Sequence, residues 1–171
     1  MIFTKKLPLV IVLLTTAFSS FADDKNKTDN KSDIVQITQL FEHYMSKYNH
    51  FIATEELKRN PSLYDDQVML ITTKGTSNTL SSDAMDKGVT AFLSDLKSKG
   101  VRKVDWENIE IKLLADHIAL ASNVAVRYNQ NGNVYNRVGA TYFLNKSSEG
   151  WRISAFAVHG HDNSIKFSHD S

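Results

Sequence analysis

The sequence contains no cysteine, no apolar run long enough to span a membrane and no large excess of charge. Without cysteine no disulfide can form, so the fold depends on packing alone, and no thiol is available for lipid attachment. Its longest apolar run is shorter than the ~20 residues that a membrane-spanning helix needs. Nearly balanced charges give no attraction to nucleic acid or to an anionic membrane.

The short motifs of common enzyme classes are also absent. There is no serine-hydrolase, phosphate-loop or dinucleotide-binding motif, and the glycines at 75, 88 and 100 are isolated. The run of His159, His161 and Asp162 could contribute metal ligands, but the pattern positions no further ligand beside them. We therefore predict no metal ion and no cofactor.

The N-terminus has the pattern of a secretory signal peptide. Lys5 and Lys6 precede an apolar segment from Leu7 to Phe18, and Ser20-Phe21-Ala22 is a small-x-small cleavage site. Without the two signal lysines, the 20 basic residues fall to 18, against 19 acidic residues. We expect an exported protein, periplasmic or secreted, that makes no membrane contact after cleavage behind Ala22.

The rest of the chain is long enough for one domain with its own core. We predict a signal peptide at residues 1–22, a flexible polar leader at 23–33, a folded domain at 34–160 and a polar tail at 161–171. The leader contains no apolar residue that could join a core.

Two or three helices are predicted from apolar residues at three- and four-residue steps. The first begins near Asp33, and residues 51–59 continue it or form a short helix that ends before Asn60-Pro61. The last is capped by Ser82 or Asp83 and ends near Gly100. Residues 67–73 are predicted as a short strand and 75–82 as a polar loop. The buried stripes of the two longer helices are Ile34, Ile37, Phe41, Tyr44, Met45 and Tyr48, and Met85, Val89, Phe92, Leu93 and Leu96.

From Val101 onward the period changes to two, which predicts antiparallel strands. A turn is expected at Ala115-Asp116, a two-residue hairpin turn at Asn131-Gly132 and a four-residue turn at Ser147 to Gly150. The first hairpin then pairs Arg127 with Asn136, and the second pairs His159 with Val138.

These pairings divide the strands into two faces. The face rich in small residues is expected to line a cavity. The opposite face is too apolar to remain in water, so we expect a homodimer through it. The cavity face carries Ala119, Ala121, Asn123, Ala125, Arg127, Asn136, Ala140, Tyr142, Ala155, Ala157 and His159, and the opposite face carries Leu120, Val124, Val126, Tyr128, Tyr135, Phe143, Phe156 and Val158.

The order of these elements resembles that of the nuclear transport factor 2-like superfamily, which includes SnoaL-like cyclases and ketosteroid isomerases. The resemblance rests on Tyr64-Asp65-Asp66, Gly75, the helix ending at Gly100, and the segment from Asn131-Gly132 to Gly150-Trp151-Arg152-Ile153. It implies an α+β fold in which a curved antiparallel sheet wraps around N-terminal helices to form a cone with an internal pocket.

The same resemblance argues against steroid isomerisation. Tyr44 matches the family's oxyanion tyrosine, but Thr72 stands where the catalytic aspartate would be, and Ala140 stands where the second oxyanion donor would be. The base and one donor are therefore missing.

We interpret the chain as an exported SnoaL-like domain that binds a small molecule. An alternative is a cyclase or dehydratase acting on a small carbonyl compound, with His159 and Tyr44 or Arg127 as weak catalytic candidates. A third is a non-catalytic dimeric interaction module. Arg127 could instead pair structurally with Glu110 or Asn136. The predicted pocket residues are Tyr44, Trp106, Asn123, Arg127, Tyr142 and His159, with Tyr48 as a further aromatic at its mouth, and the predicted dimer face comprises Tyr135, Phe143 and Phe156.

Overall fold

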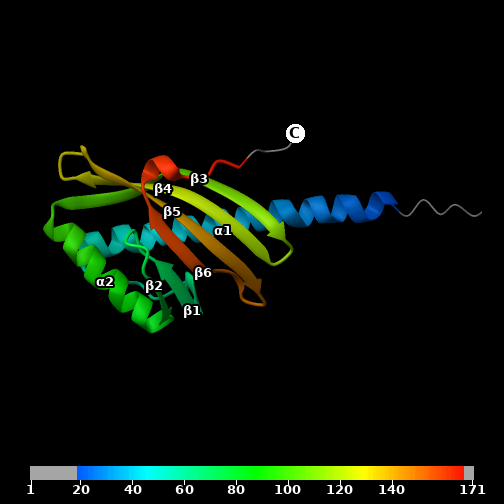
Figure 1. The fold of residues 1–171 in the computed structure, drawn as a ribbon, viewed down its shortest axis with the longest axis horizontal. Coiled ribbons are helices and arrows are strands. Elements are labelled where there is room, and N and C mark those ends of the chain that lie inside the picture. Colours follow the sequence, from blue (N-terminus) through cyan, green and yellow to red (C-terminus); the bar gives the residue numbers. More distant parts are fainter. Residues whose placement is uncertain (1–18, 168–171) are drawn as a thin grey trace, which may run out of the picture.

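The computed structural model describes residues 19–167, which form two long helices, six strands and one short 3₁₀ helix (Figure 1). The predicted signal peptide lies mostly outside this range, so its cleavage stays a prediction. Within the described range, no helix is both long enough and apolar enough to cross a membrane. The elements are α1 (Ser19–Thr54), β1 (Tyr64–Ile71), β2 (Ser77–Ser81), α2 (Ser82–Ser98), β3 (Val101–Ala115), β4 (Ile118–Asn129), β5 (Val134–Ser147), β6 (Gly150–His159) and η1 (His161–Asn163).

Helix α1 begins earlier than the sequence predicts. It starts at Ser19, so the polar segment 23–33 is helical instead of a flexible leader. Adding residues to an existing helix costs far less than nucleating one, which lets a polar segment extend a well-packed helix. The helix ends at Thr54, and Glu55 follows with a positive φ of 65°. Residues 51–54 thus continue the first helix, and 55–59 do not.

The predicted polar loop at 75–82 contains strand β2, which pairs antiparallel with β1. Gly75, with a φ of 74°, lies in the turn between them. Helix α2 is capped one residue earlier than predicted, because the Ser81 hydroxyl accepts a hydrogen bond from the Ala84 backbone N–H at 3.2 Å. Its end beside Gly100 agrees with the prediction, since Gly100 has a φ of 89°.

The six strands form one curved, open sheet in the order β2-β1-β6-β5-β4-β3. All neighbouring pairs are antiparallel except β1 and β6, which run parallel, so the sheet is mixed and not purely antiparallel as expected. Register shifts interrupt the pairing of β3 with β4 at three places, and such irregularities bend a sheet. Figure 1 shows α1 running along the concave face and α2 beside it near β1 and β2.

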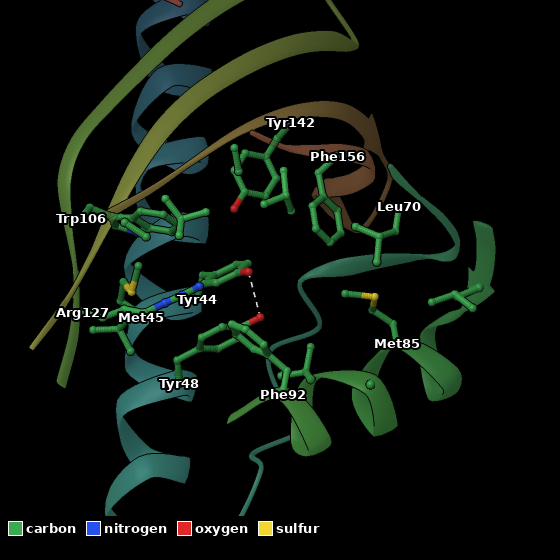
Figure 2. Close-up of a pocket in the computed structure, with 18 residues that line it drawn as sticks. Tyr44, Met45, Tyr48, Leu70, Met85, Phe92, Trp106, Arg127, Tyr142 and Phe156 are labelled. Carbon is green, nitrogen blue, oxygen red and sulfur yellow. Dashed lines mark hydrogen bonds between the residues drawn. The ribbon is translucent and has the colours of Figure 1, made fainter. Parts of the chain in front are cut away.

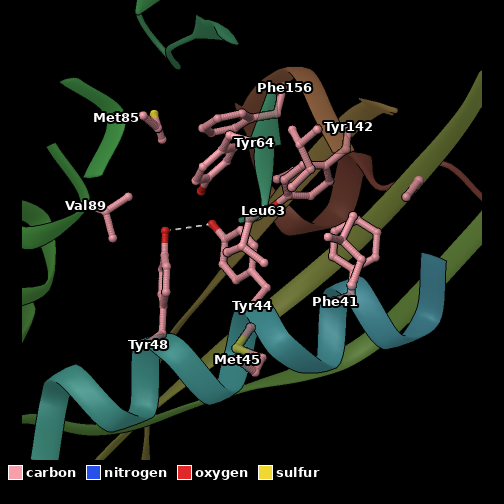
Figure 3. Packing of buried hydrophobic residues seen from close by; sticks show 14 of the residues in the cluster. Phe41, Tyr44, Met45, Tyr48, Leu63, Tyr64, Met85, Val89, Tyr142 and Phe156 are labelled. Atoms are coloured by element: carbon pink, nitrogen blue, oxygen red, sulfur yellow. Dashed lines mark hydrogen bonds between the residues drawn. The ribbon is translucent and has the colours of Figure 1, made fainter. Parts of the chain in front are cut away.

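The concave face packs against the apolar stripe of α1. Phe41 and Tyr142 meet edge to face with ring centroids 5.1 Å apart, and Figure 3 shows both among the buried aromatic residues. Near the N-terminal end of this contact, the buried carboxylate of Asp33 accepts hydrogen bonds from Lys146 Nζ at 2.6 Å and Trp151 Nε1 at 3.1 Å. These bonds tie α1 to β5 and β6.

The first hairpin has the predicted register. Arg127 pairs with Asn136, and Asn123 pairs with Ala140, as expected from Asn131-Gly132. The turn is longer than two residues, because Tyr128 pairs with Val134. A register shift beside Arg127 compensates for the extra residue, so the faces of β4 up to Arg127 and of β5 from Asn136 are those predicted, whereas Val134 takes the expected place of Tyr135 opposite Tyr128.

The second hairpin starts in the predicted register and then slips by one residue. Leu144 pairs with Ile153, but the next pair is Phe143 with Ala155, so Ser154 is an extra residue in β6. Beyond that bulge His159 lies opposite Gly139 instead of Val138. Because side chains alternate between faces, a slip of one residue exchanges the two faces of β6.

Residues 155–159 therefore face the opposite way from the prediction. Phe156 and Val158 line the concave side beside Tyr142 and Ala140, and both belong to the interior. The alternate residues of this segment, Ala155, Ala157 and His159, lie on the convex face of the sheet. The assignment of Phe156 to a dimer face is wrong, as is that of His159 to the pocket.

Gly139→Ala tests this register. A Cβ at position 139 would lie 2.5 Å from His159 Nδ1 and 2.8 Å from the Gly160 carbonyl oxygen. We expect the variant to lose about 1 to 3 kcal/mol of unfolding free energy in urea titrations, since overpacking carries a cost of that order.

Gly88→Ala is the matched control, because nothing lies within 4 Å of the added Cβ and alanine favours a helix. Adding His159→Ala to the Gly139→Ala variant should restore part of the loss. Full stability of Gly139→Ala would contradict the observed pairing.

Candidate functional site

A cavity of about 280 Å³ lies between the concave face of the sheet, α1 and α2 (Figure 2). Small residues in its walls leave the space open, notably Gly88 of α2, Ala125 of β4 and Ala140 of β5. The lining residues are Tyr44, Met45, Tyr48, Leu70, Leu80, Met85, Gly88, Val89, Phe92, Val104, Trp106, Ala125, Arg127, Val138, Ala140, Tyr142, Phe156 and Val158. None of them is an aspartate, a glutamate or a histidine.

Tyrosine hydroxyls provide polarity within otherwise apolar walls. Tyr44 donates a hydrogen bond to the Tyr48 hydroxyl at 2.8 Å, which Figures 2 and 3 both show. The hydroxyl of Tyr64 is buried next to this pair and has no hydrogen-bond partner within acceptable geometry among the described residues. Tyr64 itself does not line the cavity, so the hydroxyls that an occupant can reach are those of Tyr44, Tyr48 and Tyr142.

Burial raises the pKa of Tyr48, Tyr64 and Tyr142 well above the usual value near 10. Electrostatic interaction with Tyr44 raises the pKa of each further. These three hydroxyls are therefore protonated at neutral pH. They can donate hydrogen bonds to a carbonyl or a carboxylate, but they cannot act as bases there.

Trp106 forms part of the wall through its indole side chain. Its Nε1 donates to the backbone oxygen of Phe41 at 2.9 Å, which satisfies the only polar atom of the side chain. The ring also lies 5.4 Å from that of Tyr44, centroid to centroid. Trp106 therefore offers the cavity an apolar surface of defined orientation.

Arg127 brings the only formally charged side chain among the lining residues. Its guanidinium lies 5.1 Å from the ring centroid of Phe92, and Nη1 reaches Asn136 Oδ1 at a long 3.4 Å. Burial lowers the pKa of Arg127, but an arginine remains protonated under all ordinary conditions. The predicted alternative partner Glu110 pairs with Ser122 on the convex face, away from Arg127.

The structure brings together four of the six predicted pocket residues: Tyr44, Trp106, Arg127 and Tyr142. Tyr48 joins them. Asn123 lies on the expected face but is fully buried outside the cavity lining, and neither of its amide atoms has a partner in the part of the chain that the structure describes. His159 is on the convex face, where Nε2 contacts the Thr141 hydroxyl at 2.9 Å and Nδ1 contacts the Gly160 carbonyl oxygen at 2.9 Å.

The sequence reasoning missed the contribution of α2 and the β1–β2 hairpin to the cavity. The buried stripe that contains Met85, Val89 and Phe92 is predicted correctly, but a stripe does not distinguish a packed wall from an open one. Gly88, three residues after Met85 and next to Val89, was the sequence feature that could have indicated an open wall. Leu80 was missed because β2 was predicted as a loop.

The residues at the isomerase positions give no catalytic base. Thr72 lies in the β1–β2 turn, where its hydroxyl is 2.7 Å from that of Thr76, and it does not line the cavity. Ala140 does line the cavity but has no hydrogen-bonding side chain. In the described part of the chain there is also no group of three or more His, Cys, Asp or Glu side chains placed to hold a metal ion.

A family model described as NTF2-like protein (DUF6841) matches residues 32–161. The chain belongs to this family. The match covers the domain from the packed part of α1 to the start of η1, so it includes every residue of the cavity. No curated protein matches the sequence.

Solved structures share the fold of this NTF2-like chain at low sequence identity. An NTF2-like protein with a cystatin-like fold from Novosphingobium aromaticivorans is 12% identical, with a TM-score of 0.67, over 86% of this chain and 94% of the other. An NTF-2 like protein from Shewanella oneidensis is 18% identical, with a TM-score of 0.53, over 73% and 97%. A putative scytalone dehydratase from N. aromaticivorans is 14% identical, with a TM-score of 0.54, over 82% and 89%. These similarities establish the fold alone.

The tyrosine cluster makes a prediction about alkaline pH. Since Tyr48, Tyr64 and Tyr142 have folded-state pKa values above the unfolded value of about 10, the folded chain holds more protons than the unfolded chain above that pH. Their contribution to stability is complete below pH ~10 and is lost as the pH rises through the folded-state values. Tyrosinate absorbance should show three tyrosines that ionise only well above pH ~10 in the wild-type protein, and two such tyrosines in the Tyr48→Phe variant. Simultaneous ionisation of all tyrosines in the folded protein would disprove the cluster.

Proposed function

We propose that the protein binds a small, mainly apolar molecule in the cavity between α1, α2 and the sheet. The observation that carries this proposal is a partly open cavity of about 280 Å³ with apolar walls and a few convergent polar groups. Such a composition is typical of small-molecule sites, where apolar contact supplies affinity and sparse polar groups orient the ligand.

The volume limits the size of the ligand. A protein cavity of about 150 Å³ is large enough for benzene, so the cavity here accommodates one ring with a short substituent, or an aliphatic molecule of similar size. The hydroxyls of Tyr44, Tyr48 and Tyr142, which do line the cavity, support a ligand with an oxygen acceptor, because each can donate a hydrogen bond.

The lining residues favour binding over catalysis. A dehydratase or cyclase acting on a carbonyl compound needs a group that removes a proton. No carboxylate or imidazole is among the lining residues, and Tyr48 and Tyr142, whose pKa values are raised, stay protonated at neutral pH and so cannot accept a proton. His159, the proposed catalytic histidine, lies on the other face of the sheet. We therefore prefer a non-catalytic ligand-binding domain, and the open cavity supports it over an interaction module with a filled interior.

Export from the cytoplasm remains part of the proposal on sequence grounds. Lys5 and Lys6, the apolar segment after them and the cleavage pattern ending at Ala22 support it, together with the absence of cysteine from the chain. A periplasmic or secreted binding domain is consistent with these features.

We also propose that two copies associate through the convex face. One row of paired side chains crosses four strands there, and Phe143 at its centre is 49% exposed. A twofold axis through such a row would pair the same apolar patch with itself, which is the usual geometry of homodimers. Tyr135, at the other end of β5, is also exposed, but it lies at the register shift and pairs with no residue of β4. The row consists of Met69, Ala155, Phe143 and Leu120.

Filling the cavity tests the binding proposal. Ala140→Phe places a ring into the space from β5, whereas Ala157→Phe places the same ring on the convex face of β6. We expect gently purified wild-type protein and Ala157→Phe to retain a small molecule in native mass spectrometry, and Ala140→Phe to lose it. Equal retention by both variants would place the ligand elsewhere.

A charge in the convex row tests the dimer. Phe143→Glu would bury a carboxylate in the interface, so we expect the dimer dissociation constant from sedimentation velocity to rise at least about tenfold. Ser148→Glu, in the exposed β5–β6 turn, is the control and should leave association unchanged. A monomeric wild-type protein at high concentration would refute the dimer.

A further inference from the structure

The guanidinium of Arg127 is partly removed from water, which costs hydration free energy, and it has few polar partners. Its Nε is buried and has no hydrogen-bond partner among residues 19–167, and its contact with Asn136 Oδ1 is long at 3.4 Å. A neutral amide oxygen at that distance compensates poorly for the lost hydration of a cation. The other contact is the ring of Phe92, which provides cation–π attraction but no hydrogen-bond acceptor.

No carboxylate of the described residues forms an ion pair with Arg127. The carboxylate of Asp95 instead forms an ion pair with Lys99, whose Nζ lies 2.7 Å from Oδ2. The charge of Arg127 affects the pKa of Lys99. The other arginine of the central strands, Arg137, is bonded to Glu107 through Nε at 2.9 Å and 3.0 Å on the convex face. Arg127 thus differs from Arg137 in facing the cavity and in lacking an acidic partner.

The surroundings of Arg127 define an entrance with one cationic side. Phe92 is 39% exposed and also lines the cavity, so the pair of Phe92 and Arg127 lies where the cavity approaches solvent. Figure 2 shows Arg127 on the same side of the cavity as Tyr44 and Tyr48, opposite Leu70 and Met85. An occupant would therefore have its apolar body among the side chains of α2 and β1 and its polar end toward Arg127.

We propose that Arg127 binds a carboxylate of the ligand, which makes the ligand class a small monocarboxylic acid with an apolar body. A carboxylate matches the planar fork of donors on a guanidinium and can bond it bidentately. It would supply the acceptor that Arg127 Nε lacks, and Tyr44 and Tyr48 line the cavity on the same side as Arg127. This proposal rests on the proposed function, because it requires the cavity to be a binding site.

The test compares ω-phenylalkanoates of increasing chain length with the matching ω-phenylalkanols by isothermal titration calorimetry. The two series share an apolar body and differ in the anionic group. We expect wild-type protein to bind the acids at least about tenfold more tightly than the alcohols, as one charge-assisted bidentate contact would give. Higher salt should weaken the acids more than the alcohols.

Arg127→Met removes the charge and keeps an unbranched side chain, and Arg137→Met removes an arginine from the other face as the control. We expect Arg127→Met to lose the preference for acids while still binding alcohols, and Arg137→Met to keep it. Arg127→Lys, which retains the charge without the planar fork, should reduce the preference. If Arg127→Met does not fold, the wild-type comparison of acids with alcohols decides alone.

The outcomes separate the two proposals. Equal affinity of wild-type protein for acids and alcohols, with both blocked by Ala140→Phe, would overturn the role of Arg127 and leave the apolar cavity as a binding site. Persistence of the acid preference in Arg127→Met would also overturn that role. Failure of every member of both series to bind would overturn the proposed function together with it.

Discussion

The extra residue Ser154 in β6 determines which side chains reach the interior. Side chains alternate along a strand, so one inserted residue exchanges the faces of everything beyond it. The Ser154 hydroxyl donates to the Phe143 carbonyl oxygen at 3.2 Å, which satisfies an acceptor at the place where the pairing shifts. Because of this shift Phe156 and Val158 complete the apolar wall of the cavity, and His159 is removed from it. The absence of a base among the lining residues follows from the same displacement.

The two hairpins show how far the sequence could predict the fold. Asn131-Gly132 indicated a tight turn with residues that tolerate positive φ, and the register of β4 with β5 was predicted correctly even though the turn is longer. The segment after Ser154 alternates alanine with Phe156 and Val158, and both arrangements bury apolar atoms. Only the fit of the large residues against Tyr142 and of His159 against Gly139 distinguishes them, and that fit involves residues distant in sequence. Strand β2 was missed for a related reason, because its polar residues pair at an edge of the sheet where burial does not select apolar side chains.

The candidate site was predictable where helix and strand periodicity agreed. Tyr44 lies on the apolar stripe of α1, and Arg127 and Tyr142 lie on the correctly paired face of β4 and β5, so periodicity and pairing suffice to place all three in the pocket. It was harder to predict that the cavity is open, since α2 has the pattern of an ordinary core helix. Its wall is open because small residues of three separate elements line the same space, Gly88 on α2 and Ala125 and Ala140 on the neighbouring strands β4 and β5.

The polar groups that line the cavity are hydrogen-bond donors, and together they restrict what can occupy it. The hydroxyls of Tyr48 and Tyr142 keep their protons and can donate hydrogen bonds, and Arg127 holds a partly buried positive charge without an anion among the described residues. An entirely apolar ligand would exclude water from these groups, at a cost of about 1 to 3 kcal/mol for a neutral hydroxyl left without a partner and more for the charge. A ligand with acceptor oxygens avoids that cost, and a negative charge on those oxygens is favoured because no acidic side chain lines the cavity to oppose it. The lining residues include no carboxylate. The site therefore has no carboxylate to act as a general base, and for the same reason it does not repel an anion.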